Sequence, residues 1–92
     1  MSEKLSYAEL TARLEKCPPR GTRWWHWKNP GRIYWVAGAA IAEATQQPLV
    51  LYAPEDVKPA VVFARPLAEW TEWVDQGGGR RGPRFEMVRS PR

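Results

Sequence analysis

Residues 24–36 read WWHWKNPGRIYWV and decide the fold. They hold four of the six tryptophans and the only histidine of the chain. At their centre, Asn29-Pro30-Gly31 suits a type II turn, because proline presets φ at the second position and glycine accepts a positive φ at the third. Aromatic and β-branched residues flank this turn on both sides. The stretch therefore predicts a β-hairpin.

The position of the turn fixes which side chains of the hairpin share a face. With the turn at Pro30-Gly31, His26 pairs with Trp35 across the hairpin. Because side chains alternate along a strand, Trp24 and Lys28 are predicted to lie on the same face as this pair. This aromatic and basic face is the first candidate for a binding surface.

Patterns on either side of the hairpin complete the expected fold. Upstream, Ser6 and Glu9 form a capping box, and an apolar stripe predicts a helix over about residues 6–17 that must dock on the β-structure. Downstream, short β-rich segments between turn signals predict further strands, of which Ala60–Ala64 is expected to be the most buried. Residues 76–83 are rich in glycine and are typical of a flexible loop.

Length and strand pattern together predict the architecture. A chain of 92 residues corresponds to one domain, with the helix, a β-barrel over about residues 21–88 and a basic C-terminal tail at residues 89–92. Five or six short strands favour a mainly-β fold, namely a small, strongly bent antiparallel barrel of Src-homology-3-like size with one N-terminal helix. Small residues at 38–42 indicate that one strand bends sharply.

The sequence also predicts the compartment. No apolar run reaches the length of a membrane span, and residues 1–5 contain no signal-peptide core. The single cysteine, Cys17, cannot form an internal disulfide. We therefore expect a cytoplasmic protein with no membrane partner, and a monomer is the favoured state.

Several chemistries lack the residues that they need. One cysteine and one histidine do not supply a metal site. Cys17 lies on the apolar stripe of the helix and is expected to be buried and inert. His26 is expected to orient a loop or a ligand, with Glu72 as its nearest carboxylate, and not to act as a general base. We therefore predict no catalytic residue, no metal and no cofactor, and an enzyme or a small-molecule binder is the less favoured class.

Charge and aromatic content favour a binding module. The net charge is +4, and the last stretch of the chain carries arginines at positions 80, 81, 84, 89 and 92. Such a segment attracts phosphate groups, although it also suits a solvated chain end. Nucleic acid is the leading partner, and another protein bound through the Trp-rich face is the alternative. The candidate binding residues are Trp24, His26, Lys28, Arg32, Trp35, Arg65, Arg80, Arg81 and Arg84.

An ordered set of residues also resembles a known family. The set comprises His26-Trp27-Lys28, Gly31, Tyr34-x-Val36-x-Gly38-x-Ala40, Thr45, Pro48-Leu49-Val50-x-Tyr52, Arg65-Pro66-Leu67, Glu72-x-Val74 and Arg84-Phe85. In this order and spacing, residues 21–88 resemble a small bacterial family, domain of unknown function 1653. The resemblance implies a small mostly-β domain and no established activity. The chain departs from the family pattern at Ala42, Ala44, Gln47 and Phe63.

Overall fold

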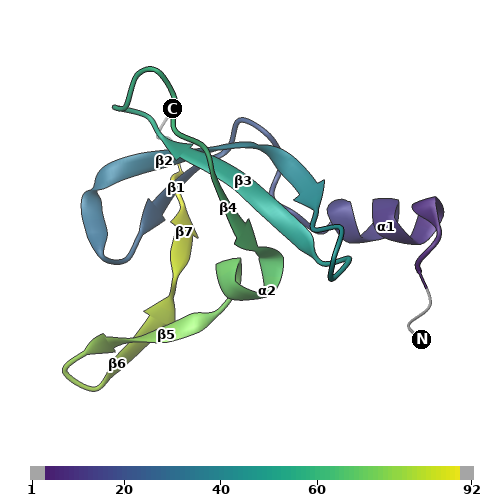
Figure 1. The fold of residues 1–92 in the computed structure, drawn as a ribbon. Helices are drawn as coiled ribbons and strands as arrows, with labels where there is room; N and C mark the ends of the chain where they lie inside the picture. Colours follow the sequence, from purple (N-terminus) through teal and green to yellow (C-terminus); the bar gives the residue numbers. More distant parts are fainter. Residues whose placement is uncertain (1–3, 90–92) are drawn as a thin grey trace.

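The computed structural model of the protein describes residues 4–89 (Figure 1). The predicted basic tail at 89–92 therefore lies outside the described residues except for Arg89. The helices are α1 (Tyr7–Leu14) and α2 (Leu67–Trp70), and the strands are β1 (Arg23–His26), β2 (Asn29–Ile41), β3 (Pro48–Pro54), β4 (Phe63–Pro66), β5 (Trp73–Gly77), β6 (Arg80–Pro83) and β7 (Phe85–Met87).

The prediction of a mainly-β, bent antiparallel fold is confirmed, but the sheet does not close into a barrel. Its five strands follow the order β4-β3-β2-β1-β7, so β4 and β7 are its edges. The chain between these edges folds into α2 and the separate β5–β6 hairpin, which extends away from the sheet (Figure 1). Among residues 4–89, no further strand joins β4 to β7, so the sheet stays open between these two edges. Shifts of register in β1 and β2 mark β-bulges, which bend the sheet.

The hairpin at residues 24–36 forms, but its turn lies earlier than predicted. The chain reverses at Trp27 and Lys28, and Asn29 already belongs to β2. Trp24 therefore pairs with Tyr34. The predicted partner of Trp24 was three residues further on, and an odd shift exchanges the two faces of a strand.

This register separates the two tryptophans that were predicted to share a face. Trp24 packs against the core with its ring 5.3 Å from that of Trp70, whereas Trp35 pairs with Arg23 on the opposite face. The predicted shared face of Trp24, Lys28 and Trp35 is therefore wrong. The observed register places Tyr34 in the core together with Trp24, and this apolar burial outweighs the turn preference of Asn-Pro-Gly.

The core lies between the five-stranded sheet and α2, and aromatic rings dominate it. The rings of Trp70 and Phe85 stack with centroids 3.7 Å apart and planes 6° apart. Tyr52 meets both rings edge-on. The prediction that Cys17 is buried is confirmed, and burial raises the pKa of its thiol. The buried cluster consists of Cys17, Tyr34, Val36, Val50, Tyr52, Trp70 and Phe85.

Two predictions downstream of β3 are wrong. Residues 60–64 are not a buried strand, because β4 begins only at Phe63 and is a sheet edge. The apolar residues of this segment are about half exposed, at 48% for Val61, 50% for Val62 and 47% for Phe63. Residues 76–83 are not a loop, since positive φ at Gly78 and Gly79 closes the tight turn of the β5–β6 hairpin.

Helix α1 begins as predicted and ends earlier. The capping box is confirmed: the Glu9 N–H donates to Ser6 Oγ at 3.1 Å, and the Ser6 N–H donates to Glu9 Oε1 at 2.8 Å. The helix ends at Leu14 and not near Cys17. It contacts β2 and β3, and Arg13 Nη1 donates to the Gln46 carbonyl at 3.1 Å. The helix is thus held against the turn between β2 and β3.

Charges placed on the docked side of α1 are expected to destabilise the protein. Leu10 and Leu14 are partly buried, so Leu10→Asp and Leu14→Asp should each lower the free energy of unfolding by roughly 1–3 kcal/mol. Tyr7→Asp is the matched control, because Tyr7 is 87% exposed on the same helix. Urea unfolding of the three variants checks this. Equal midpoints for all three would show that the docking of α1 contributes no stability.

Candidate binding site

The predicted binding residues do not form one continuous surface. Trp24 is in the core, and Arg80 and Arg81 lie on the projecting β5–β6 hairpin. Four of the predicted residues do lie near one another. The Lys28 backbone N–H donates to His26 Nδ1, Arg65 lines the same hollow as His26, and the Arg84 carbonyl accepts from the N–H of Trp27, the residue after His26.

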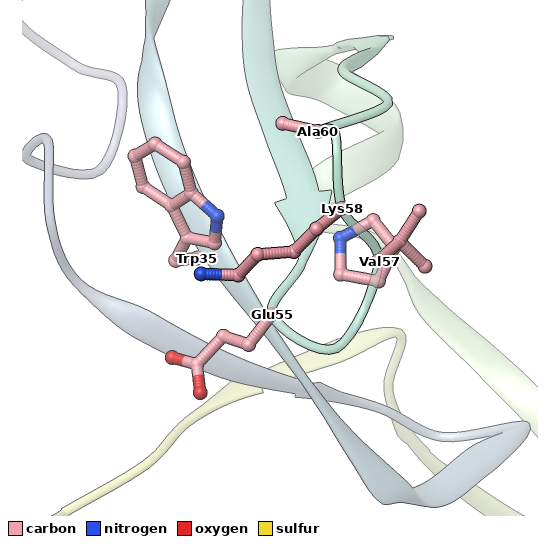
Figure 2. Close-up of a pocket in the computed structure, with 6 residues that line it drawn as sticks. Trp35, Glu55, Val57, Lys58 and Ala60 are labelled. Carbon is pink, nitrogen blue, oxygen red and sulfur yellow. The ribbon is translucent and has the colours of Figure 1, made fainter.

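Trp35 lies in a separate hollow of about 400 Å³ beside the loop that follows β3. Figure 2 shows the Lys58 side chain running between Trp35 and Val57, with Glu55 beneath. Arg23 Nε donates to Glu55 at 2.6 Å and holds the pKa of that carboxyl below its ordinary value. Glu55 and Lys58 both line this hollow, so its wall carries charges of both signs.

The neighbouring cation Arg32 is also engaged, because its Nη2 lies 3.2 Å from Asp56 Oδ2. Arg23 and Arg32 therefore already have acidic partners. Such exposed pairs are weak, and Lys58, which also lines this hollow, forms no ion pair among residues 4–89.

A second hollow, of about 290 Å³, opens beside His26 and crosses four adjacent strands from β1 to β4. We call it the donor hollow. Its wall consists of the aromatic rings of the core edge, and its rim is more polar. The lining residues are His26, Asn29, Tyr34, Tyr52, Phe63 and Arg65.

Tyrosine hydroxyls meet side-chain donors in the donor hollow. Asn29 Nδ2 donates to the Tyr34 hydroxyl at 3.2 Å, and Arg65 Nε donates to the Tyr52 hydroxyl at 3.3 Å. Each hydroxyl keeps its own hydrogen to donate, and neither donates it to a residue within the range 4–89. The hollow therefore offers two O–H groups to a ligand.

His26 contributes a further donor. Its Nδ1 accepts a hydrogen bond from the Lys28 backbone N–H at 3.1 Å, so a neutral ring carries its proton on Nε2. Burial lowers the pKa of His26, and the charges of Arg65, Arg84 and Lys28 lower it further. Near pH 7 the imidazole is therefore neutral and offers the Nε2–H group.

The arginines near His26 have exposed acidic partners. Glu72, the carboxylate expected to serve His26, instead accepts from Arg84 Nη2 at 2.7 Å. Arg65 Nη1 lies 3.4 Å from Glu69 Oε1, and the Glu69 side chain is 53% exposed. Exposed ion pairs of this kind are weak, so the anionic group of a ligand can compete for both guanidinium groups.

His26 should make the stability of the protein depend on pH. The pKa of His26 in the folded protein is below the ordinary value of 6.5, so the unfolded chain binds a proton at higher pH than the folded chain does. The free energy of unfolding should therefore fall as the pH drops through about 6.5 toward the folded-state pKa.

Thermal unfolding between about pH 7.5 and pH 5 measures this dependence. His26→Gln should remove the decline in the upper part of that range, because the chain has one histidine and carboxylates titrate lower. A decline that persists in the His26→Gln variant would assign the effect to another group.

Sequence comparison decides the family. A model described as "Protein of unknown function (DUF1653)" matches residues 22–87. The chain belongs to this family. The resemblance drawn from the sequence is thereby confirmed, and the family description states no activity. A search of curated proteins found no match to the chain.

A solved member of DUF1653 has the same fold. The crystal structure of a protein of this family from Bordetella bronchiseptica is 27% identical to the chain, with a TM-score of 0.63. The match covers 86% of this chain and 99% of that protein. The bent, mostly-β fold is therefore shared by the two proteins.

Several residues of the donor hollow were not among the binding residues predicted from the sequence. Asn29 was placed in the turn, and Phe63 in a buried strand. Tyr34 and Tyr52 stand in the set of residues that carried the resemblance to DUF1653, as do His26 and Arg65. These residues become neighbours only through the order of the strands, which the sequence alone does not give.

Other kinds of site find no support in the part of the chain that is described. Among residues 4–89, no three His, Cys, Asp or Glu side chains gather so that they could hold a metal ion. No helix in that range is both long enough and apolar enough to cross a membrane. The donor hollow, where side-chain donors meet aromatic rings, is the strongest candidate for a functional site.

Proposed function

We propose that this DUF1653 protein is a nucleic-acid-binding module that holds one nucleotide of a single strand in the donor hollow. The observation that carries the proposal is the convergence of hydrogen-bond donors on an aromatic hollow that no carboxylate lines. A nucleotide suits this chemistry, because its base is planar and rich in acceptors and its phosphate is anionic.

The donors favour an acceptor-rich ligand over a cationic one. The hydroxyls of Tyr34 and Tyr52 each accept one bond and keep a hydrogen to donate. Arg65 adds a guanidinium group, which binds phosphate or carbonyl oxygen well. Together these groups match the carbonyl and phosphate oxygens of a nucleotide.

An exposed ring completes the proposed site. Phe63 is 47% exposed at the edge of the sheet, and its ring lies 5.8 Å from that of Tyr52. A base stacked on such a ring contributes about 1–3 kcal/mol to binding and does so for any base. Lys28 and Arg84, which lie close enough to affect His26, would attract the backbone.

Fluorescence anisotropy with labelled oligonucleotides tests the proposal. We expect single strands of DNA or RNA to bind more tightly than duplexes, and binding to weaken with salt with a slope of about −0.7 per phosphate contact. Phe63→Ala should weaken binding by about 1–3 kcal/mol and leave the slope unchanged, because stacking releases no ions. Val61→Ala, 48% exposed on the same segment, is the matched control. No binding of any strand at low salt would overturn the proposal.

The projecting β5–β6 hairpin is expected to contribute only to long strands. Arg80 and Arg81 do not line the donor hollow, and Arg81 Nη2 donates to the Trp73 carbonyl at 3.3 Å. Replacing both arginines with alanine should therefore leave the affinity for a mononucleotide unchanged. For an oligonucleotide, we expect the same change to reduce the salt slope by about one or two phosphate contacts. A loss of mononucleotide affinity would place the bound nucleotide near the hairpin instead.

A protein-interaction module is the second candidate, and the exposed apolar run before β4 favours it. Val61 and Val62 are about half exposed beside an edge strand, where a partner chain could pair. In that case Val61→Asp should abolish binding of the partner, and salt should matter little. The two functions therefore differ in their response to salt and to this substitution.

A further inference from the structure

A third hollow, of about 340 Å³, lies between the end of β1 and the β5–β6 hairpin, and it shares His26 with the donor hollow. We call it the indole hollow. Its chemistry differs from that of the donor hollow, because two indole rings and a carboxylate line it and no lysine or arginine does. The lining residues are Trp25, His26, Trp27, Pro30, Gln76, Pro83 and Glu86.

Glu86 gives the indole hollow a negative charge. It lies directly opposite Trp25 in the pairing of β1 with β7, so the two side chains leave the sheet on the same face. Glu86 is exposed, and among residues 4–89 it forms no ion pair and its side chain makes no hydrogen bond. In this it differs from Glu55, Glu69 and Glu72, each of which has an arginine partner.

Trp27 already attracts a cation. The Nζ of Lys28 lies 5.4 Å from the centroid of the Trp27 ring, which is the distance of a cation–π contact. Two indole rings beside one carboxylate are the elements of an aromatic cage for a positive charge. His26 adds no repulsion, because its ring is neutral near pH 7.

The lining also decides which kind of cation fits. A primary ammonium group donates three hydrogen bonds and needs three acceptors. The side chains of Trp25, Trp27, Pro30 and Pro83 offer no acceptor, so an N–H group could bond only to the two carboxylate oxygens of Glu86 or the amide oxygen of Gln76, and most of the lining is apolar or aromatic. A fully methylated ammonium group has no N–H donor to satisfy, is weakly hydrated and prefers the face of an indole ring.

We propose that the indole hollow binds a methylated ammonium group, with Trp25 and Trp27 around the methyl groups and Glu86 as the counter-charge. His26 lines both hollows, but this proposal does not rest on the nucleotide site in the donor hollow, and either proposal can fail without the other. A free small molecule and a methylated lysine side chain both carry this group, so the test includes both.

Titration with choline, followed through the indole N–H resonances in NMR spectra, is the direct test. We expect the signals of Trp25 and Trp27 to shift with saturation, while those of Trp35 and Trp73 stay in place. The neutral isostere 3,3-dimethyl-1-butanol should bind at least about tenfold more weakly, because it has the shape but not the charge. Comparing a trimethyllysine peptide with the same peptide carrying unmodified lysine shows whether a methylated side chain also binds in the indole hollow. If choline and its isostere bind equally, or if neither shifts these signals, the proposal is wrong.

Variants separate the roles of charge and ring. Glu86→Gln should weaken choline binding by roughly 5- to 10-fold, and Glu43→Gln, which removes an exposed carboxylate outside the hollow, should not. Lys28→Met should tighten binding, because it removes the internal cation that competes for Trp27. Thermal unfolding of each variant confirms that the fold is retained. Equal losses in the Glu86→Gln and Glu43→Gln variants would show that only net charge matters and would overturn the proposed site.

Discussion

Replacing Trp70 with alanine is expected to lower the free energy of unfolding by about 3–5 kcal/mol, because the core is built around this ring. Trp70 is 3% exposed and stacks on Phe85 with ring centroids 3.7 Å apart. It also meets Tyr52 and Trp24 edge-on, so its removal leaves a cavity beside three rings. Because small domains are stable by only about 5–15 kcal/mol, the variant should lose a large share of its stability.

Two further variants show whether packing is the cause. Trp73 follows shortly after Trp70 and is 59% exposed, so Trp73→Ala should change the stability by less than about 0.5 kcal/mol. Trp70→Phe should cost less than Trp70→Ala, because it keeps a ring and removes an indole N–H that has no acceptor among residues 4–89. Urea midpoints at equal slope provide the comparison. Similar losses for Trp70→Ala and Trp73→Ala would contradict this account of the core.

The second large effect concerns the donor hollow. Arg65→Met should weaken the binding of a single-stranded oligonucleotide by roughly 10- to 100-fold, since a hydrogen bond to a charged group contributes about 1.5–3 kcal/mol. Methionine keeps most of the alkyl chain, so packing near Phe85, whose ring lies 5.5 Å from the Arg65 guanidinium carbon, is largely retained. Anisotropy titrations at constant salt measure the loss.

Arg32 provides the matched control for this prediction. It is also paired with an acidic residue, but it lies outside the donor hollow. Arg32→Met should therefore reduce affinity by no more than about one phosphate contact in the salt slope. If Arg65→Met and Arg32→Met weaken binding equally, the arginines act through net charge and the donor hollow has no special role.

Local signals in the sequence predicted local structure well. The capping box at Ser6 and Glu9 depends on residues three apart, and it forms with both hydrogen bonds. Cys17 is buried, as its place on the apolar stripe of the helix predicted. These features depend on neighbours in the chain, or on one clear apolar position, and so they can be inferred from sequence.

Features that depend on distant partners were not predictable in the same way. The hairpin turn moved because burial of Trp24 and Tyr34 on one face decides the register, and a turn signal is weak beside it. The apolar run before β4 was expected to be buried, yet an edge strand has no neighbour on its outer side. For the same reason, the donor hollow needed the strand order before Tyr52 and Phe63 could be placed beside His26.

The position of β1 has a consequence for folding. It pairs on one side with β2, which follows it directly, and on the other side with β7, the last strand among residues 4–89. As the chain leaves a ribosome, β1 can pair with β2 early, but it can pair with β7 only after β3 to β6 have also emerged. Closing so long a loop costs entropy before any contact repays it, so the step should be slow. Until β7 pairs with it, one edge of β1 stays unpaired, and aggregation through pairing with another chain is then most favoured.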